Sequence, residues 1–120
     1  MANILTVDDT ATMRQMISFT LSSVGHQVAQ AGDGQEALTL ARGQRFDLVI
    51  ADVNMPNMDG IALVRALRAM PDFRFTPILM LTTESQETKR QEGKSAGATG
   101  WIVKPFNPEQ LISVVQKVLS

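Results

Sequence analysis

The sequence predicts an α/β fold, a doubly wound parallel sheet of five strands with helices on both faces. Short apolar runs typical of buried strands alternate along the chain with segments of helical periodicity. Such alternation indicates a parallel sheet with right-handed crossovers. The 120 residues are enough for one domain with a single core. We therefore expect residues 1–120 to form one domain with no further output domain.

Composition excludes several classes of function. The net charge is −1 with acids and bases interspersed, whereas a nucleic-acid-binding module shows a basic face. The chain has no cysteine and only one histidine, His26, which argues against disulfides, thiolate chemistry and histidine-based sites. No segment approaches the roughly 18 apolar residues of a membrane span, and the N-terminus lacks a signal-peptide pattern. We expect a cytoplasmic protein with no nucleic-acid partner and no membrane insertion.

Each strand is predicted from a short apolar run bounded by turn residues. The five runs cover residues 4–7, 27–31, 48–51, 77–82 and 100–103, of which the second is the weakest. Four of them lead into or end in functional groups, namely Asp8 with Asp9, Asp52, Thr82 and Lys104. Because the carboxyl ends of parallel strands lie along one edge of a sheet, we expect these groups to converge there.

Four helices are predicted from apolar residues at helical spacing. The first has Thr10 or Thr12 as its cap, and Gly25 ends it as a C′ glycine would. The second follows the turn at 32–34, the third follows Gly60, and the last begins at Asn107 with a proline at N1. The inward-facing residues of the four helices are Met13, Ile17, Leu21 and Val24; Ala37, Leu38 and Ala41; Ile61, Leu63, Val64 and Leu67; and Leu111, Ile112, Val115, Val118 and Leu119.

The segment 85–95 differs from the others because it contains no large apolar residue. A helix there, with Gly93 inside it, would have little core to hold it and would be marginally stable. One interpretation is a solvated face of the molecule. The other is a movable output helix, which its position directly after the Thr82 strand favours.

The acidic groups at the expected edge indicate a divalent cation. Asp8, Asp9 and Asp52 would repel one another if they met without a counter-charge, and Mg²⁺ or Mn²⁺ with oxygen ligands removes that repulsion. The backbone carbonyl of Asn54 is a candidate for a further ligand. Asp8 and Asp9 alone are more often a helix-capping pair, so the metal prediction depends on the other strand ends joining them.

A carboxylate beside a divalent cation, a lysine and a hydroxyl is suited to accept a phosphoryl group. Aspartate is a covalent nucleophile in phosphoryl transfer, so we interpret Asp52 as the reactive residue. Lys104 and the cation would offset charge on the phosphoryl oxygens, and Thr82 would donate a hydrogen bond to one of them. Alone, Thr82 at a strand end is more often a cap or turn residue, and Lys104 alone indicates nothing.

The motifs around these residues resemble those of a known family. They occur in order along nearly the whole chain: Val7-Asp8-Asp9, Asp52 with Asn54-Met55-Pro56-Asn57-Met58-Asp59-Gly60, Leu81-Thr82-Thr83-Glu84, and Lys104-Pro105-Phe106. The chain resembles the receiver domains of two-component response regulators, specifically the stand-alone CheY-like chemotaxis type. The resemblance implies a flavodoxin-like (βα)5 fold with strand order 2-1-3-4-5.

The resemblance also assigns roles to the residues of the site. It implies that Asp52 accepts a phosphoryl group from the phosphohistidine of a histidine kinase. Mg²⁺ would be held by Asp8 and Asp9 together with Asp52, and Lys104 and Thr82 would contact the phosphoryl group. The resemblance also implies a cis peptide bond between Lys104 and Pro105, which a tight loop can hold at modest cost.

Two further positions are similar to residues that tune hydrolysis of the acyl phosphate in this family. They are Asn54 and Glu84, which flank the phosphoryl site. The resemblance therefore implies a short-lived phosphorylated state that suits fast signalling.

Trp101 stands where the family more often has a tyrosine or phenylalanine that acts as an aromatic switch. An indole is larger and has a single N–H donor. Trp101 either moves inward when Thr82 moves, or is a surface aromatic at the sheet edge.

The expected output face combines segment 85–95, the Trp101 strand and the last helix. A solvated charged face is an equally simple account of its basic residues. Those residues are Lys89, Arg90 and Lys94.

Three functions fit the predicted site. The first is a phosphorylation-switched signalling protein that catalyses only its own phosphorylation and dephosphorylation. Its partners would be a chemotaxis-type histidine kinase and an effector such as a flagellar motor switch protein. The second is a phosphorelay carrier that passes its phosphoryl group to a histidine phosphotransfer protein. The third is a small Mg²⁺-dependent phosphatase or phosphotransferase, which the chain length disfavours because little is left for a cap over the substrate.

Overall fold

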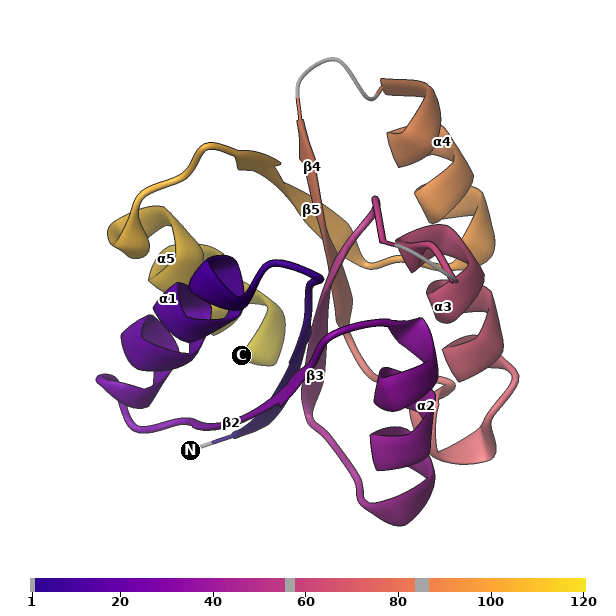
Figure 1. Cartoon of the computed structure of the whole chain (residues 1–120), viewed down its shortest axis with the longest axis horizontal. Coiled ribbons are helices and arrows are strands. Elements are labelled where there is room, and N and C mark those ends of the chain that lie inside the picture. The colour runs from indigo at the N-terminus through magenta and orange to yellow at the C-terminus, as the bar shows by residue number, and fades with distance from the viewer. Residues whose placement is uncertain (1, 56–57, 84–86) are drawn as a thin grey trace.

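A parallel β-sheet forms the middle layer of the molecule (Figure 1). The computed structural model describes residues 2–55, 58–83 and 87–120, and within them five strands are ordered β2-β1-β3-β4-β5. The strands are β1 (Asn3–Val7), β2 (Gln27–Ala31), β3 (Leu48–Asp52), β4 (Ile78–Thr83) and β5 (Gly100–Lys104). The predicted fold class and the strand order implied by the resemblance are confirmed.

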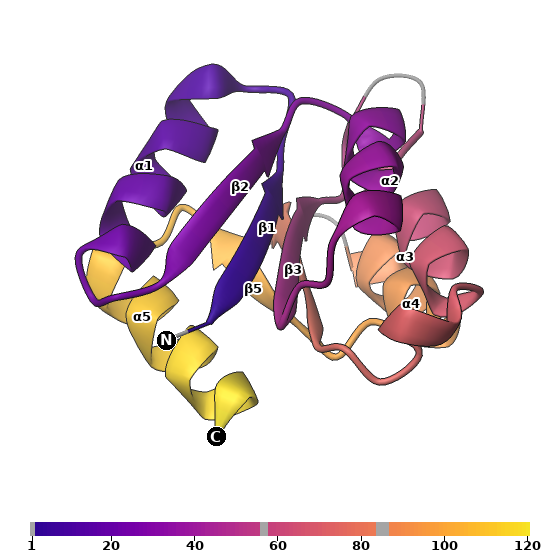
Figure 2. The same cartoon turned by 90° about the horizontal axis from the view of Figure 1, so that it is seen from below.

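Helices cover both faces of the sheet (Figure 2). They are α1 (Ala11–Ser22), α2 (Gly34–Gly43), α3 (Gly60–Arg68), α4 (Glu87–Ala96) and α5 (Pro108–Leu119), with a short 3₁₀ helix, η1 (Pro71–Phe73), before β4. α1 and α5 pack over a core cluster that includes Ile4 and Ile50. The other three helices cover the opposite face, over a cluster that includes Leu5 and Val49, because successive strand residues point to opposite faces. Across the described residues, no helix is both long and apolar enough to cross a membrane.

Polar caps begin the helices close to the predicted positions. Asp33 and Asp59 precede α2 and α3, and each accepts a backbone N–H from three residues further along at 2.8 Å. Asn107 forms a capping box at the start of α5, with Pro108 as the first helical residue. Thr10 is the N-cap residue of α1, although its side chain makes no capping bond.

The predicted end of the first helix is wrong. α1 ends at Ser22, and Val24, which the helical spacing assigns to the buried stripe, is 44% exposed. Gly25 has a positive φ of 97°, so it does provide a left-handed turn, but it lies beyond the C′ position. Val24 matches the helical spacing by coincidence, so the apolar pattern in the sequence continues beyond the end of α1.

α4 forms although its sequence lacks large apolar residues. Of its residues, all of which are described, only Gly93 is buried. A Cβ atom at Gly93 would lie 3.8 Å from Sδ of Met80, so the helix backbone passes close to β4. α4 therefore rests on the sheet over a small area, as the polar segment predicts.

Candidate functional site

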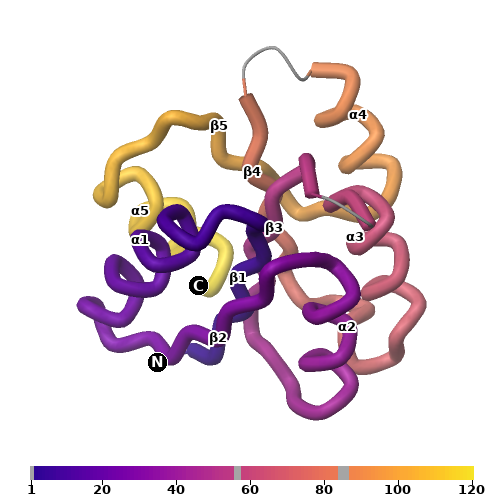
Figure 3. The backbone as a smooth tube through the Cα atoms, viewed as in Figure 1, coloured from indigo at the N-terminus to yellow at the C-terminus, as the bar shows by residue number. Residues whose placement is uncertain are grey.

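The carboxyl ends of the parallel strands β1, β3 and β5 lie at one edge of the sheet (Figure 3). Three of the predicted site residues come together at this edge. Val7 of β1 pairs with Ala51 of β3, so Asp8 and Asp52 occupy adjacent positions. Lys104, at the end of β5, reaches both carboxylates: its Nζ lies 2.9 Å from Oδ2 of Asp52 and 3.8 Å from Oδ2 of Asp8. The peptide bond after Lys104 is cis, as the resemblance implies.

Asp8 is buried, and most of its polar atoms are held by the surrounding backbone and by Arg14. Its N–H donates to the carbonyl of Ala31 at 3.1 Å, and its Oδ1 accepts from the N–H of Thr10 at 2.9 Å. Its carbonyl oxygen accepts from Nη1 of Arg14 at 2.5 Å. Oδ2 is buried without a hydrogen-bond partner among the described residues. Asp8 therefore presents to the site a carboxylate oxygen that is 3.8 Å from Nζ of Lys104 but accepts no hydrogen bond among the described residues.

Burial raises the pKa of Asp8 above its usual value of 3.8. The hydrogen bond from Thr10 and the charge of Lys104 oppose this rise, and the charges of Asp52 and Asp9 add to it. The folded state thus holds the Asp8 proton more tightly than the unfolded state. The resulting contribution to stability is complete below pH 3.8 and is lost as the pH rises through the folded-state pKa. Above the folded-state pKa, the ionised carboxylate is less favourable in the folded than in the unfolded state, and positive charge bound beside it would offset this cost.

Asp52 ends β3, a strand that is buried along its whole length. Its Oδ1 accepts a hydrogen bond from the backbone N–H of Asn54 at 3.2 Å, and its Oδ2 pairs with Lys104. At Gly60, the first residue of α3, a Cβ atom would lie 2.2 Å from the carbonyl oxygen of Asp52. Only glycine fits this approach. The pair Asp59-Gly60, which the sequence pattern marks as a turn, therefore also positions Asp52.

Three carboxylates form an oxygen-rich cluster at this edge. One oxygen from each of Asp8, Asp9 and Asp52 lies within 4.8 Å of the others. A cation would explain why Oδ2 of Asp8 is buried without a hydrogen-bond partner among the described residues, since such an atom is otherwise costly. Ligands that are all oxygen favour Mg²⁺ or Mn²⁺. The residues present fit a magnesium site, and the Asn54 carbonyl stays a prediction as a further ligand.

Thr82 lies one residue beyond the point where β4 pairs with the end of β3. Leu81 is the sheet partner of Asp52, so Thr82 follows at the carboxyl edge. Its hydroxyl is buried and has no hydrogen-bond partner among the described residues. The hydroxyl is thus a donor available to a group that enters the site. Glu84, further along the chain, lies outside the described residues.

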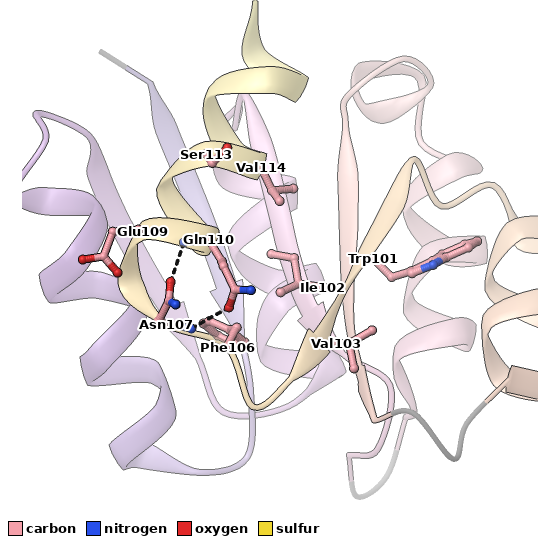
Figure 4. Close-up of a pocket in the computed structure, with 9 residues that line it drawn as sticks. All are labelled: Trp101, Ile102, Val103, Phe106, Asn107, Glu109, Gln110, Ser113 and Val114. Atoms are coloured by element: carbon pink, nitrogen blue, oxygen red, sulfur yellow. Dashed lines mark hydrogen bonds between the residues drawn. The ribbon is translucent and has the colours of Figure 1, made fainter.

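Trp101 lies on the face of the sheet that α4 covers. It pairs with Met80 and is half-buried against the core cluster that includes Leu5 and Val49. Figure 4 shows its ring directed away from the pocket between β5 and α5, which Ile102 and Phe106 also line. Trp101 instead faces a surface hollow shared with α4. The predicted basic residues of the output face belong to α4: Lys89, Arg90 and Lys94.

Arg14 is a residue of the site that the sequence pattern does not indicate. It lies in the first turns of α1, and its guanidinium binds the backbone carbonyl of Asp8. The available signal is only its position, a long cationic side chain shortly after an acidic pair. A hydrogen bond to a backbone carbonyl has no characteristic residue pattern, so the sequence does not indicate this role for Arg14.

Comparison with known proteins agrees with this geometry. Residues 4–116 match the family model of the response regulator receiver domain. The chain is 40% identical over 116 residues to the chemotaxis protein CheY of Pseudomonas aeruginosa, covering 96% of this chain and 94% of that protein. It is 37% identical to the transcriptional regulatory protein SrrA of Staphylococcus aureus, covering 97% of this chain and 47% of that protein.

A solved structure shows the same arrangement. The chemotaxis response regulator CheY4 of Vibrio cholerae matches with a TM-score of 0.95 at 55% identity, and the match covers 99% of both chains. The family model, the relatives and the fold agree with one another. The chain belongs to the response regulator receiver domain family, whose members are phosphorylation-switched signalling modules rather than conventional enzymes.

Proposed function

We propose that Asp52 accepts a phosphoryl group from the phosphohistidine of a histidine kinase and that this switches the protein between signalling states. The observation that carries the proposal is the position of the Asp52 carboxylate. It accepts a hydrogen bond from Lys104 at 2.9 Å and is grouped with the carboxylates of Asp8 and Asp9. Asp52 therefore has both a cationic side chain and metal-binding oxygens close to it, which supports phosphoryl transfer to this aspartate.

The transfer requires mainly positioning and charge from the protein. An oxygen of Asp52 forms a bond to phosphorus while the P–N bond of the phosphohistidine breaks, and the electron pair of that bond stays on the imidazole nitrogen. Bound Mg²⁺ supplies positive charge that offsets the charge of the phosphoryl oxygens. Lys104, which already contacts Asp52, exchanges this carboxylate for a phosphoryl oxygen and adds a second positive charge.

Thr82 and Trp101 are proposed to carry the signal away from the site. Phosphorylation adds close to two negative charges and new acceptor oxygens, and the unpartnered hydroxyl of Thr82 is a donor for one of them. Movement of Thr82 toward the phosphoryl group vacates space that Trp101 can enter. The proposed output face then comprises α4, β5 and α5, with Lys89 and Arg90 as basic residues of α4.

The phosphorylated state is proposed to be short-lived. Asn54 is exposed beside Asp52, and its backbone N–H already contacts the acceptor carboxylate. Its side chain is proposed to affect how water reaches the acyl phosphate. Glu84 is the second residue proposed to tune hydrolysis, and it lies outside the described residues.

We further propose a role in chemotaxis. CheY and CheY4, which match this chain over nearly their whole lengths, are chemotaxis proteins. SrrA is a transcriptional regulator of about twice the length matched. The proposed partners are accordingly a chemotaxis-type histidine kinase and an effector such as a flagellar motor switch protein.

Treatment with acetyl phosphate tests the proposed acceptor. We expect intact-mass measurement to detect one phosphoryl group on the wild type in Mg²⁺, and none in EDTA or on Asp52→Asn. The asparagine keeps the size of the side chain and removes its nucleophilic charge, so it separates chemistry from folding. Equal modification of Asp52→Asn, or an unmodified wild type with both acetyl phosphate and a phosphorylated kinase, would contradict the proposal. Onward transfer to a histidine phosphotransfer protein would instead identify a phosphorelay carrier.

A further inference from the structure

We propose that Arg14 is a positioning residue for the divalent cation and acts through the peptide bond that joins Asp8 to Asp9. This inference rests on the proposed function, since it requires the acidic cluster to bind Mg²⁺. Among the described residues, no ion pair joins Arg14 to Asp8, Asp9 or Asp52. Its Nη1 donates instead to the backbone carbonyl of Asp8 at 2.5 Å. Its influence on the cluster therefore passes through the backbone.

Asp9 is the ligand that depends on this peptide bond. Asp8 is fixed by its own N–H and by Oδ1. The side chain of Asp9 is exposed, and no hydrogen bond or ion pair within the described residues fixes its carboxylate. The Asp8–Asp9 peptide fixes the backbone nitrogen from which Asp9 extends, and the carbonyl of this peptide is the group that Arg14 binds. Arg14 thus keeps the Asp9 carboxylate within reach of the other two.

The guanidinium of Arg14 lies near the turn between β2 and α2. Arg14 is half-buried, and a Cβ atom at Gly32 would lie 3.6 Å from its Nη1 and 3.7 Å from Oε2 of Glu36. The guanidinium therefore passes close to Gly32, near the carboxylate of Glu36. A planar group with several donors suits this position better than the single ammonium of a lysine.

Positioning and simple electrostatics predict changes of opposite sign. Arg14 carries a positive charge near a cation site, so by charge alone its removal tightens Mg²⁺ binding. If Arg14 orients Asp9, its removal weakens binding, because loss of a residue that supports a metal ligand lowers affinity by about 10- to 100-fold. The sign of the change distinguishes the two mechanisms.

Isothermal titration calorimetry with Mg²⁺ alone tests the inference. The proteins are the wild type, Arg14→Met, Arg14→Lys and Arg65→Met, where Arg65 is an exposed arginine of α3 and controls for the loss of one charge. We expect Arg14→Met to bind Mg²⁺ about 10-fold more weakly than the wild type. Arg14→Lys, which keeps a donor and the charge, should be intermediate, and Arg65→Met should match the wild type.

Thermal unfolding without Mg²⁺ establishes that each variant is folded. Binding by Arg14→Met that equals or exceeds binding by Arg65→Met overturns the inference and leaves the proposed function intact. If Arg14→Met does not fold, Arg14→Lys serves as the test variant. A Mg²⁺ affinity of Arg14→Lys equal to that of the wild type then overturns the inference. Failure of the wild type to bind Mg²⁺ overturns the metal site of the proposed function, and the inference with it.

Discussion

Helices α3 and α4 lie side by side on the same face of the sheet, yet they are attached to it differently (Figure 1). α4, which is described throughout, buries only Gly93. α3 buries more than half of its residues: Gly60, Ile61, Leu63, Val64 and Leu67. Because most helical stability in a protein comes from packing of an apolar face, α3 is part of the framework of the site, whereas α4 is weakly bound to it.

α4 is fastened at its C-terminal end. The N–H groups of Gly97 and Ala98 both donate to the carbonyl of Gly93, at 3.1 and 2.9 Å, and Gly97 closes the helix with a φ of 112°. Arg68 of α3 donates from Nε to the carbonyl of Gly97 at 3.0 Å. We infer that the N-terminal half of α4, which follows the Thr82 strand in the chain, has the greater freedom to respond to phosphorylation.

Loss of a large side chain from α3 should have the largest effect on stability. Leu67 is fully buried, so Leu67→Ala should lower the free energy of unfolding by about 2–5 kcal/mol through lost burial and the cavity left behind. Urea unfolding followed by Trp101 fluorescence measures this change. The matched change in α4 is Gln91→Ala at an exposed position, which should alter stability by less than about 0.5 kcal/mol. Similar losses in both helices would erase the difference between them.

A methyl group at the start of α3 should disturb stability and chemistry together. A Cβ atom at Gly60 would lie 2.2 Å from the carbonyl oxygen of Asp52, so Gly60→Ala should lower the free energy of unfolding by about 1–3 kcal/mol. It should also slow phosphorylation, because the backbone that carries Asp52 must move. Denaturant unfolding and the rate of acetyl phosphate labelling measure the two effects. A folded Gly60→Ala variant labelled at the wild-type rate would show that α3 does not position Asp52.

The contact that Arg68 makes between α3 and the end of α4 should contribute less to stability than the buried residues of α3. The guanidinium of Arg68, whose pKa is lowered by burial, donates to the carbonyls of Gly97, Phe73 and Thr76 at 3.0, 2.6 and 2.7 Å. Arg68→Met keeps the apolar stem and should lower the free energy of unfolding by about 1 kcal/mol. It should also accelerate amide hydrogen exchange in the last turn of α4. Unchanged exchange there, relative to Arg65→Met, would mean that Arg68 does not fasten α4.

The smallest expected effect is a gain in stability, whereas the preceding substitutions lower it. The nearest atom to a Cβ built at Gly93 is Sδ of Met80 at 3.8 Å, an ordinary contact. Gly93→Ala should therefore stabilise α4, raising the free energy of unfolding by about 0.5–1 kcal/mol through reduced backbone entropy. The melting temperature measures this gain. A lower melting temperature would show that α4 packs more tightly on the sheet than its contacts indicate.

The strand ends are the part of the site that the sequence predicts best. Apolar runs with abrupt polar ends identify β1, β3 and β5, and parallel topology then requires Asp8, Asp52 and Lys104 to meet at one edge. The structure brings these side chains together as expected. The same patterns also predict that the segment forming α4 has little core, because its lack of large apolar residues is visible without coordinates.

Contacts to backbone atoms are the part that the sequence does not reveal. Arg14 binds a carbonyl oxygen, and Gly60 is required by the approach of another carbonyl. Neither contact produces a periodic pattern in the sequence, because its partner is a backbone atom and not a second side chain. Val24 shows the reverse error, since it matches the helical period but follows the end of α1. Periodicity describes which face is buried and not where the helix stops.

Amide hydrogen exchange in α3 and α4, before and after phosphorylation by acetyl phosphate in Mg²⁺, tests the difference between the helices most directly. We predict slow exchange in residues 60–68 in both states, faster exchange in residues 87–96 before phosphorylation, and a changed rate in residues 87–96 afterwards. Asp52→Asn should show no change under the same treatment. Equal protection of the two helices, or phosphorylation of Asp52 with no change in α4, would contradict α4 as the element that responds to the site.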